Sequence, residues 1–241
     1  CTSERKMKMN IKIAVVNNSG NMGKSTICDS LLLPRLEGAK VVKVETINTD
    51  GTNDVKISAK EFLEITKKIG AKGSVIVDVG SSNVEIFFEK IREFHGTQED
   101  FDYFIVPVTP ENKGQMDTLL TIGALLDLNV EPERIRVIFN KVDPGRAFDK
   151  QFSGILENQL FCSLKIKRYP IIRNTELFFH LNEMNKTLKE VLDDDRDFRK
   201  LMRECEDDDE LEILSTERAI KRLATGVNED LNMAFNLLDI V

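Results

Sequence analysis

An eight-residue run of mostly small side chains, closed by a lysine and two hydroxyl residues, has the clearest chemistry in this sequence. It reads Ser19-Gly20-Asn21-Met22-Gly23-Lys24-Ser25-Thr26. Small residues let backbone N–H groups curl around an anion, Lys24 adds a cation for β- and γ-phosphates, and the Ser25 hydroxyl can bind Mg²⁺. The run therefore predicts a nucleotide phosphate site, with a chance turn as the alternative.

The segments on either side of this run are those that a phosphate-binding loop needs. The apolar run Ile11–Val16 precedes it and predicts a buried strand, and a helix with apolar residues Ile27 and Leu31 follows it. The positive end of that helix points at the loop. Asn18 stands where the usual pattern has glycine, and since asparagine tolerates positive φ, we expect the turn to form.

Strand and helix patterns alternate along most of the chain. The predicted strands are Ile11–Val16, Val41–Glu45, Ser74–Val79, Tyr103–Val108, Arg136–Asn140 and, with a weaker pattern, Leu164–Tyr169. The predicted helices between them are Lys24–Leu36, Ala59–Ile69, Val84–Phe94, Lys113–Leu126 and Ala147–Leu160. This alternation predicts an α/β fold with a doubly wound, mostly parallel sheet, in which ligands bind at the carboxyl ends of the strands.

No strand pattern remains after about Asn182. The segments Asn185–Leu192, Asp197–Glu204, Ser215–Leu223 and Leu231–Ile240 predict helices, and the acidic runs Asp193–Asp195 and Glu206–Glu210 predict loops beside them. We expect an N-terminal extension (residues 1–10), a nucleotide-binding domain (11–182) and a C-terminal helical extension (183–241). The extension either packs on the sheet or serves as a partner-binding arm.

Two carboxylates end predicted strands near the loop. Asp78 closes the apolar run of the third strand and suits the outer shell of Mg²⁺, with a helix N-cap as the alternative. Gly80, two residues later, can contact a γ-phosphate through its amide. Glu45 ends the second strand and is a candidate to orient the attacking water, or else an exposed strand-end residue.

The fifth predicted strand ends in Asn140-Lys141-Val142-Asp143. An asparagine at a strand tip can hydrogen-bond a purine edge, and Asn-Lys-x-Asp also reads guanine in many GTPases, so spacing alone leaves GTP open. The alternative is a turn, because Asn140, Asp143, Pro144 and Gly145 are all turn formers. We predict base contact for Asn140 and, as a weaker candidate, for Asp143.

Composition narrows the class of protein. The chain has 241 residues, four cysteines without C-x-x-C spacing and two histidines, which gives no basis for a disulfide framework, a zinc site or serine-protease chemistry. No apolar stretch approaches the ~20 residues that span a bilayer, and the polar start lacks a secretory signal pattern. We expect a cytoplasmic protein without membrane contact. The net charge of −7 arises from the segment after residue 192.

With these residues placed, the chain resembles the ParA/MinD group of deviant P-loop ATPases over about residues 10–180. The motifs that carry the resemblance are the loop at 19–26, Val75–Gly80, Phe104–Pro110, Asn140-Lys141 and Tyr169–Arg173. The pattern Asn17–Thr26 with Leu33-Pro34-Arg35-Leu36 is most similar to StbB-type plasmid stability proteins.

The resemblance implies a P-loop NTPase that binds ATP and Mg²⁺, dimerises around the nucleotide and hydrolyses it to ADP. It also implies a role in plasmid partition, stability or conjugation, with a plasmid-encoded DNA-binding partner protein and possible non-specific DNA contact. All of residues 19–26 would hold the nucleotide, with Lys24, Asp78 and Glu45 catalytic and Ser25 and Asp78 at the metal.

The sequence also departs from the group. Ser19 replaces a lysine that crosses to the partner's phosphates, and Asn21 replaces a glycine. Losing a cation can slow turnover greatly, so a nucleotide-gated binding scaffold with little hydrolysis is the alternative. A metabolic ATP-dependent ligase or kinase is a third possibility, which needs a second substrate pocket. Arg196, Arg199, Lys200 and Arg203 could meet DNA phosphates or form an ion-paired surface.

Overall fold

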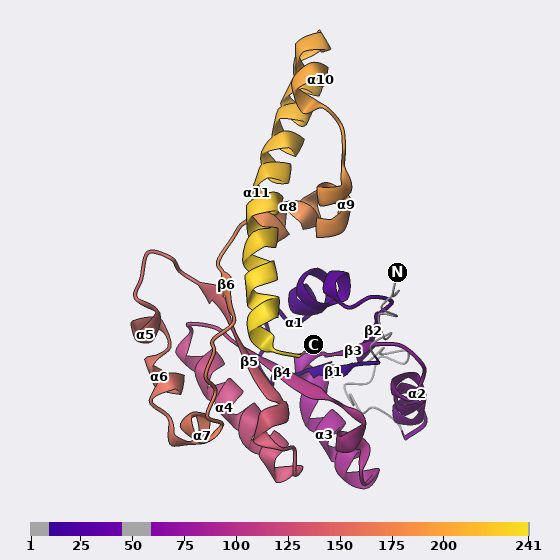
Figure 1. Cartoon of the computed structure of the whole chain (residues 1–241), viewed down its shortest axis with the longest axis vertical. Coiled ribbons are helices and arrows are strands. Elements are labelled where there is room, and N and C mark those ends of the chain that lie inside the picture. The colour runs from indigo at the N-terminus through magenta and orange to yellow at the C-terminus, as the bar shows by residue number, and fades with distance from the viewer. Residues whose placement is uncertain (1–9, 45–58, 241) are drawn as a thin grey trace, which may run out of the picture.

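The computed structural model describes residues 10–44 and 59–240, in which six parallel strands form one sheet (Figure 1). The strands are β1 (Lys12–Val15), β2 (Lys40–Val44), β3 (Val75–Val79), β4 (Tyr103–Val108), β5 (Ile135–Val142) and β6 (Ile171–Arg173). Their order across the sheet is β2-β3-β1-β4-β5-β6. Helices cover both faces, which confirms the predicted α/β fold.

The helices fall into two groups by the face of the sheet that they cover. The first group is α2 (Ala59–Ile69), α3 (Val84–Glu93), α4 (Asn112–Asp127), α5 (Phe148–Gln151), α6 (Ser153–Leu156) and α7 (Gln159–Ser163). The second is α1 (Lys24–Thr26) with its continuation to Arg35, α8 (Leu177–Glu183), α9 (Leu188–Asp193) and α11 (Asp208–Leu238), while α10 (Phe198–Glu204) packs on α11.

Alternating side chains of the strands build two cores. Along β1 and the residue that follows it, Ala14 and Val16 point into the core beneath α2 to α7. Ile13 and Val15 point into the core beneath α1 and α11. The central strands are buried on both faces, so they read as continuous apolar runs. In the described part of the chain, no helix has the length and hydrophobicity needed to cross a bilayer.

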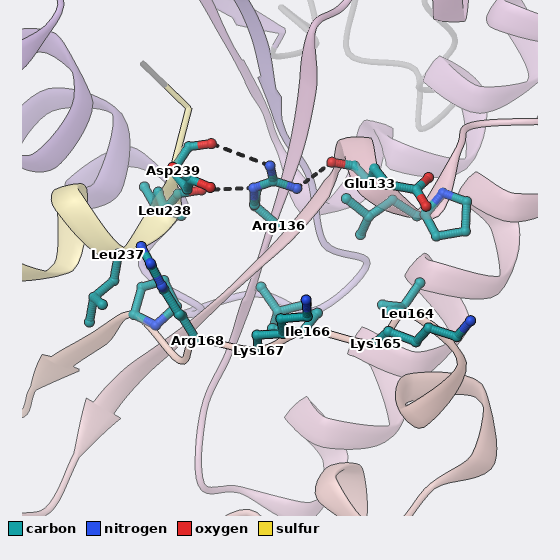
Figure 2. A pocket seen from close by; sticks show the side chains of 14 residues that line it. Glu133, Arg136, Leu164, Lys165, Ile166, Lys167, Arg168, Leu237, Leu238 and Asp239 are labelled. Carbon is teal, nitrogen blue, oxygen red and sulfur yellow. Dashed lines mark hydrogen bonds between the residues drawn. The ribbon is translucent and has the colours of Figure 1, made fainter.

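The long helix α11 ends against the amino end of β5 through Arg136. Figure 2 shows the Arg136 guanidinium between two chain segments, and its Nε donates to the Leu238 carbonyl at 2.7 Å. Other guanidinium nitrogens donate to the carbonyls of Glu133 and, at 3.3 Å, Asp239. Since the last carbonyls of a helix lack intrahelical partners, this arginine caps α11 and fixes it to the sheet.

We expect Arg136→Ala to destabilise the fold by about 2 kcal/mol, because partly buried helix-end carbonyls lose their donor. Urea unfolding followed by circular dichroism measures the change. Lys167→Ala, which removes an exposed lysine from the pocket that Arg136 also lines (Figure 2), is the matched control and should change stability little. Equal effects of the two variants would contradict a capping role for Arg136.

Two predicted elements of the sheet domain are wrong, and a third, the helix that begins at Lys24, differs only in its type of helical turn. The segment Leu164–Tyr169 is not a strand, because Leu164 and Lys165 donate backbone hydrogen bonds that close α7 and Lys165 has φ 52°. The pairing strand begins after Pro170, at β6. The single helix expected over Ala147–Leu160 is three short helices, because the backbone leaves helical geometry at Phe152 and Asn158. The predicted helix Lys24–Leu36 changes to π-helical turns at Ile27.

The C-terminal prediction differs in its continuity. The two helices expected at Ser215–Leu223 and Leu231–Ile240 are parts of the single 31-residue helix α11. Gly226 does not interrupt it, and the predicted loop residues Asp208–Glu210 form its first turn, where acidic side chains favour the helix dipole. Helix α8 was not predicted. In Figure 1 α11 runs across the sheet and beyond it, with α10 beside its outer part.

An ion-pair network ties the connection before α10 to the outer part of α11. Arg196 contacts Asp194 at 2.6 Å and Glu217 at 2.7 Å, and Lys186 contacts Glu217 at 2.7 Å. The hydrogen bonds from Arg196 lower the pKa of Asp194 to about 2, against an ordinary value of 3.8. Arg196 therefore forms ion pairs within the chain, as predicted by the alternative in which these basic residues form an ion-paired surface.

We expect the Asp194 carboxylate to make stability depend on pH. Because its folded-state pKa is depressed, its contribution is present above about pH 4 and is lost as pH falls toward about 2. Asp194→Asn should lower the urea midpoint at pH 7 and flatten its fall between these pH values. Asp195→Asn, an exposed neighbour, is the control. Identical pH profiles for wild type and Asp194→Asn would contradict the prediction.

Candidate functional site

The loop between β1 and α1 curls at the carboxyl end of the sheet. Asn21 and Gly23 have positive φ, 56° and 81°. Asn18 does not appear among the described residues with positive φ, so the conformational demand lies at positions 21 and 23. A Cβ on Gly23 would lie 2.3 Å from the Asn140 amide nitrogen, so this position needs glycine for space as well as for φ.

Lys24 lies inside the loop. Its side chain is buried, and its ammonium donates to the Asn17 and Ser19 carbonyls, both at 3.0 Å. Burial lowers the pKa of Lys24, and the negative charge of Asp78 opposes that shift. The loop therefore encloses the Lys24 ammonium and offers it neutral carbonyl oxygens as hydrogen-bond partners. A buried cation with neutral partners favours the binding of an anion.

Asp78, near the end of β3, is close enough to Lys24 for its negative charge to act on the ammonium. It is buried, in register with Val15 of β1. The N-cap alternative has no support, because Gly80 and Asn83 precede the following 3₁₀ and α-helices and neither helix start has a side-chain cap bond. The structure thus brings Asp78 and Lys24 together. Ser25 is exposed at the start of α1, and Glu45 lies outside the described residues.

Asn140 fastens the loop to the tip of β5. Its amide donates to the Met22 carbonyl at 2.8 Å, and the side chain is buried. Asp143 lies farther along, in the turn that the alternative predicts: its carboxylate accepts from the Gly145 backbone at 2.8 Å. Asn140 therefore joins the loop cluster, and Asp143 shapes the chain after β5. Base contact by either residue stays a prediction.

Helix α4 forms the other wall of the loop, and the sequence analysis did not assign it a role. Asn17 donates to Thr118 Oγ1 at 2.8 Å, and the Asn18 backbone donates to Thr121 Oγ1 at 3.2 Å. Asp117 pairs with Lys113 at 2.7 Å, and hydrogen bonds from Lys113 and Ser19 lower the pKa of Asp117. Thr118 and Thr121 are buried hydroxyl residues in an otherwise apolar part of the helix, and this pattern could have indicated from the sequence that α4 supports the loop.

One loop acceptor has no partner within the described residues. The Asn18 side-chain oxygen is buried and makes no hydrogen bond. A buried polar group without a partner is costly, so such groups often meet a ligand or water. Because an amide oxygen only accepts hydrogen bonds, this atom needs a ligand hydroxyl, an amine or water as its donor, whereas the Lys24 ammonium is the group that fits a phosphate.

A cavity of about 900 Å³ opens beside α1. Ser25, Thr26 and Lys43 line it together with apolar side chains that include Phe178 and Leu181. The sequence analysis found no second pocket of this kind. The cavity has room for a small organic molecule next to the Ser25 and Thr26 hydroxyls.

Comparison with known proteins gives distant structural similarity alone. No protein-family model matches the sequence, and no curated protein matches it. Among solved structures, MinD in a MinC:MinD complex from Aquifex aeolicus has 15% identity and a TM-score of 0.49, covering 76% of this chain and 88% of that one.

Two further structures are similar to the same extent. Apo McdA from Cyanothece has 15% identity and a TM-score of 0.47, covering 76% of this chain and 93% of that one. A putative plasmid partition protein from Borrelia burgdorferi B31, bound to AMPPNP, has 16% identity and a TM-score of 0.45, covering 73% and 90%. We transfer no ligand, partner or activity from these proteins to this chain.

Proposed function

We propose that this protein is a Mg²⁺-dependent switch that binds ATP, dimerises on it and hydrolyses it slowly to ADP. The observation that supports this most is the buried Lys24 ammonium, enclosed by the loop and placed beside Asp78. The exposed Ser25 hydroxyl and the amides at the start of α1 stand next to it.

Each residue has a distinct task in this proposal. Lys24 exchanges its carbonyl partners for the β- and γ-phosphates, and Ser25 and Asp78 hold Mg²⁺, directly and through water. When bound, Mg²⁺ neutralises charge that develops on the phosphates during transfer. Asn140 keeps the loop in its binding conformation through Met22, and Glu45 is the proposed residue that orients water.

The cellular role that we propose follows the resemblance of the sequence to StbB-type proteins. The switch acts in plasmid partition, stability or conjugation in the cytoplasm. The proposed partners are a second copy and a plasmid-encoded DNA-binding protein, with non-specific DNA as a further candidate and no membrane contact. Ser19 removes one cation from the predicted site, which supports slow turnover.

The test is phosphate release from ATP and from GTP, with and without Mg²⁺ and duplex DNA. We expect slow, Mg²⁺-dependent turnover of ATP and little turnover of GTP. Equal turnover of both nucleotides would indicate a switch without base selectivity, and turnover of GTP alone would indicate a GTP-specific switch. Nucleotide binding without any turnover would leave the nucleotide-gated scaffold, and absence of binding would overturn the proposal.

The cavity beside Ser25 favours a second candidate, a metabolic ATP-dependent ligase or kinase. Such an enzyme would place its small substrate against Phe178 and Leu181, within reach of the nucleotide. A panel of carboxylic acids and nucleosides, assayed for ADP release, tests this candidate. Stimulation that Leu181→Trp abolishes would support it, and stimulation by DNA alone would favour the switch.

A further inference from the structure

The outer part of α11 presents one continuous exposed face. Asp208, Glu212, Ser215, Ala219 and Arg222 are all exposed and follow one another at alternating spacings of four and three residues. That spacing puts them on one side of a helix with about 3.6 residues per turn. Figure 1 shows this part of α11 extending away from the sheet.

The charges on this face are divided between its two ends. Asp208 and Glu212 lie at the amino end, Arg222 lies at the other end, and Arg218 adjoins it one turn earlier. Within the described residues, none of these four side chains forms an ion pair, whereas Arg196 pairs with two acidic groups. The face therefore has two unpaired charge patches of opposite sign.

An arginine-lined cavity adjoins the basic end. Arg199 and Arg203 of α10 and Arg218 of α11 surround a cavity of about 390 Å³ with Met202 at its wall. Arg218 contacts only the Met202 sulfur there, at 3.8 Å. Guanidinium groups held together without a counter-charge repel one another, and a carboxylate placed among them would relieve this repulsion.

No acidic side chain is among the described residues that line this cavity. Asp209 and Glu212 line a different cavity, whose one lysine, Lys186, pairs with Glu217. One arm therefore leaves its acidic patch and its basic patch without partners, at opposite ends of the exposed face. A long nucleic acid is a poor occupant, because its phosphates would also approach the acidic run at residues 206–210.

We propose that the arms of two copies of this chain pair antiparallel along this face of α11. Asp208 then meets the partner's Arg222, and Glu212 meets the partner's Arg218. Both pairings are symmetric about Ser215, so a two-fold axis at Ser215 forms each of them twice. The small side chains of Ser215 and Ala219 allow close approach of the two helices. This contact is separate from the nucleotide site.

Charge reversal tests the pairing. The first doubly substituted chain, Asp208→Arg with Glu212→Arg, reverses the charge of the acidic patch. The second, Arg218→Glu with Arg222→Glu, reverses the charge of the basic patch. Sedimentation velocity without nucleotide should show a salt-sensitive wild-type dimer. Each doubly substituted chain alone should dissociate at least about tenfold more readily. An equimolar mixture of the two should restore the dimer, because every ion pair then has opposite charges again.

Several results would overturn this proposal. A monomeric wild type, or a mixture that fails to recover, would show that the face does not bind a second copy. Binding of duplex DNA that the arginine reversal abolishes, with no change in oligomeric state, would make the face a nucleic-acid surface. Since Lys24→Ala leaves the arm intact, arm pairing in that variant separates this proposal from the nucleotide-dependent one.

Cysteine cross-linking locates the axis. In a chain with serine at positions 1, 162 and 205, Ser215→Cys should form an intermolecular disulfide under mild oxidation, since a two-fold axis brings it to its own copy. Thr225→Cys, also exposed on α11, is the matched control and should stay reduced. Equal cross-linking at both positions would indicate random collision and contradict the register.

Discussion

Lys24→Ala is expected to abolish nucleotide turnover, with a loss of about 10³-fold or more. The ammonium is buried in the loop, and in the proposed function it is the cation that binds the phosphates. Phosphate release from ATP with Mg²⁺ measures the change. Lys72→Ala, which removes an exposed lysine far along the chain, should retain wild-type turnover.

Folding must be separated from chemistry in this variant, because Lys24 also satisfies the Asn17 and Ser19 carbonyls. Thermal unfolding without nucleotide measures the structural cost. Addition of ATP and Mg²⁺ should raise the melting temperature of the wild type and leave that of Lys24→Ala unchanged. A folded variant that still binds and hydrolyses ATP at the wild-type rate would place the phosphates elsewhere.

The parallel sheet was predictable because its buried strands are short apolar runs that alternate with helical patterns. All five stronger strand predictions correspond to β1 to β5, with ends shifted by a few residues. The sixth strand was misplaced, because Leu164 and Ile166 alternate with lysines as the residues of a strand do. The local signal there could not show that Lys165 takes a left-handed conformation to close α7.

The continuity of α11 could not be read from local propensity. Gly226 and Asn228 weaken the helical pattern between its two halves, but contacts from distant parts of the chain stabilise it. Asn228 accepts hydrogen bonds from Arg35 through its backbone and side-chain oxygens, at 3.3 and 2.7 Å, and Ala224 is buried against the sheet face. Tertiary contacts thus override propensity.

The sequence predicted the position of the loop in the candidate site, but it did not predict the residues of other elements that contact the loop. The spacing of Gly23, Lys24 and Ser25 predicts a phosphate-binding loop, since its chemistry is local, and the structure shows a curled loop around Lys24 at this place. The contributions of Thr118 and Thr121 are not local, because α4 reaches the loop only through the strand order of the folded sheet. Asn140 was predicted near a base, and the structure shows it holding Met22.

Gly23→Ala has the second large expected effect. A side chain at φ 81° is strained, and its Cβ would lie 2.3 Å from the Asn140 amide nitrogen, which must move and lose its bond to Met22. We expect a stability loss of about 2 to 3 kcal/mol and at least about a 10²-fold loss of ATP affinity. Urea unfolding and equilibrium titration with ATP and Mg²⁺ measure these effects.

Two further variants assign the cause. Gly20→Ala adds the same methyl group where the nearest atom, Ser81 Oγ, lies 3.8 Å away and φ is not positive, so it should be tolerated. Combining Gly23→Ala with Asn140→Ala removes the colliding amide. The double variant should therefore lose less stability than the sum of the two single losses. Strict additivity would show that Gly23 and Asn140 act independently, and that the contact between β5 and the loop does not set the loop's conformation.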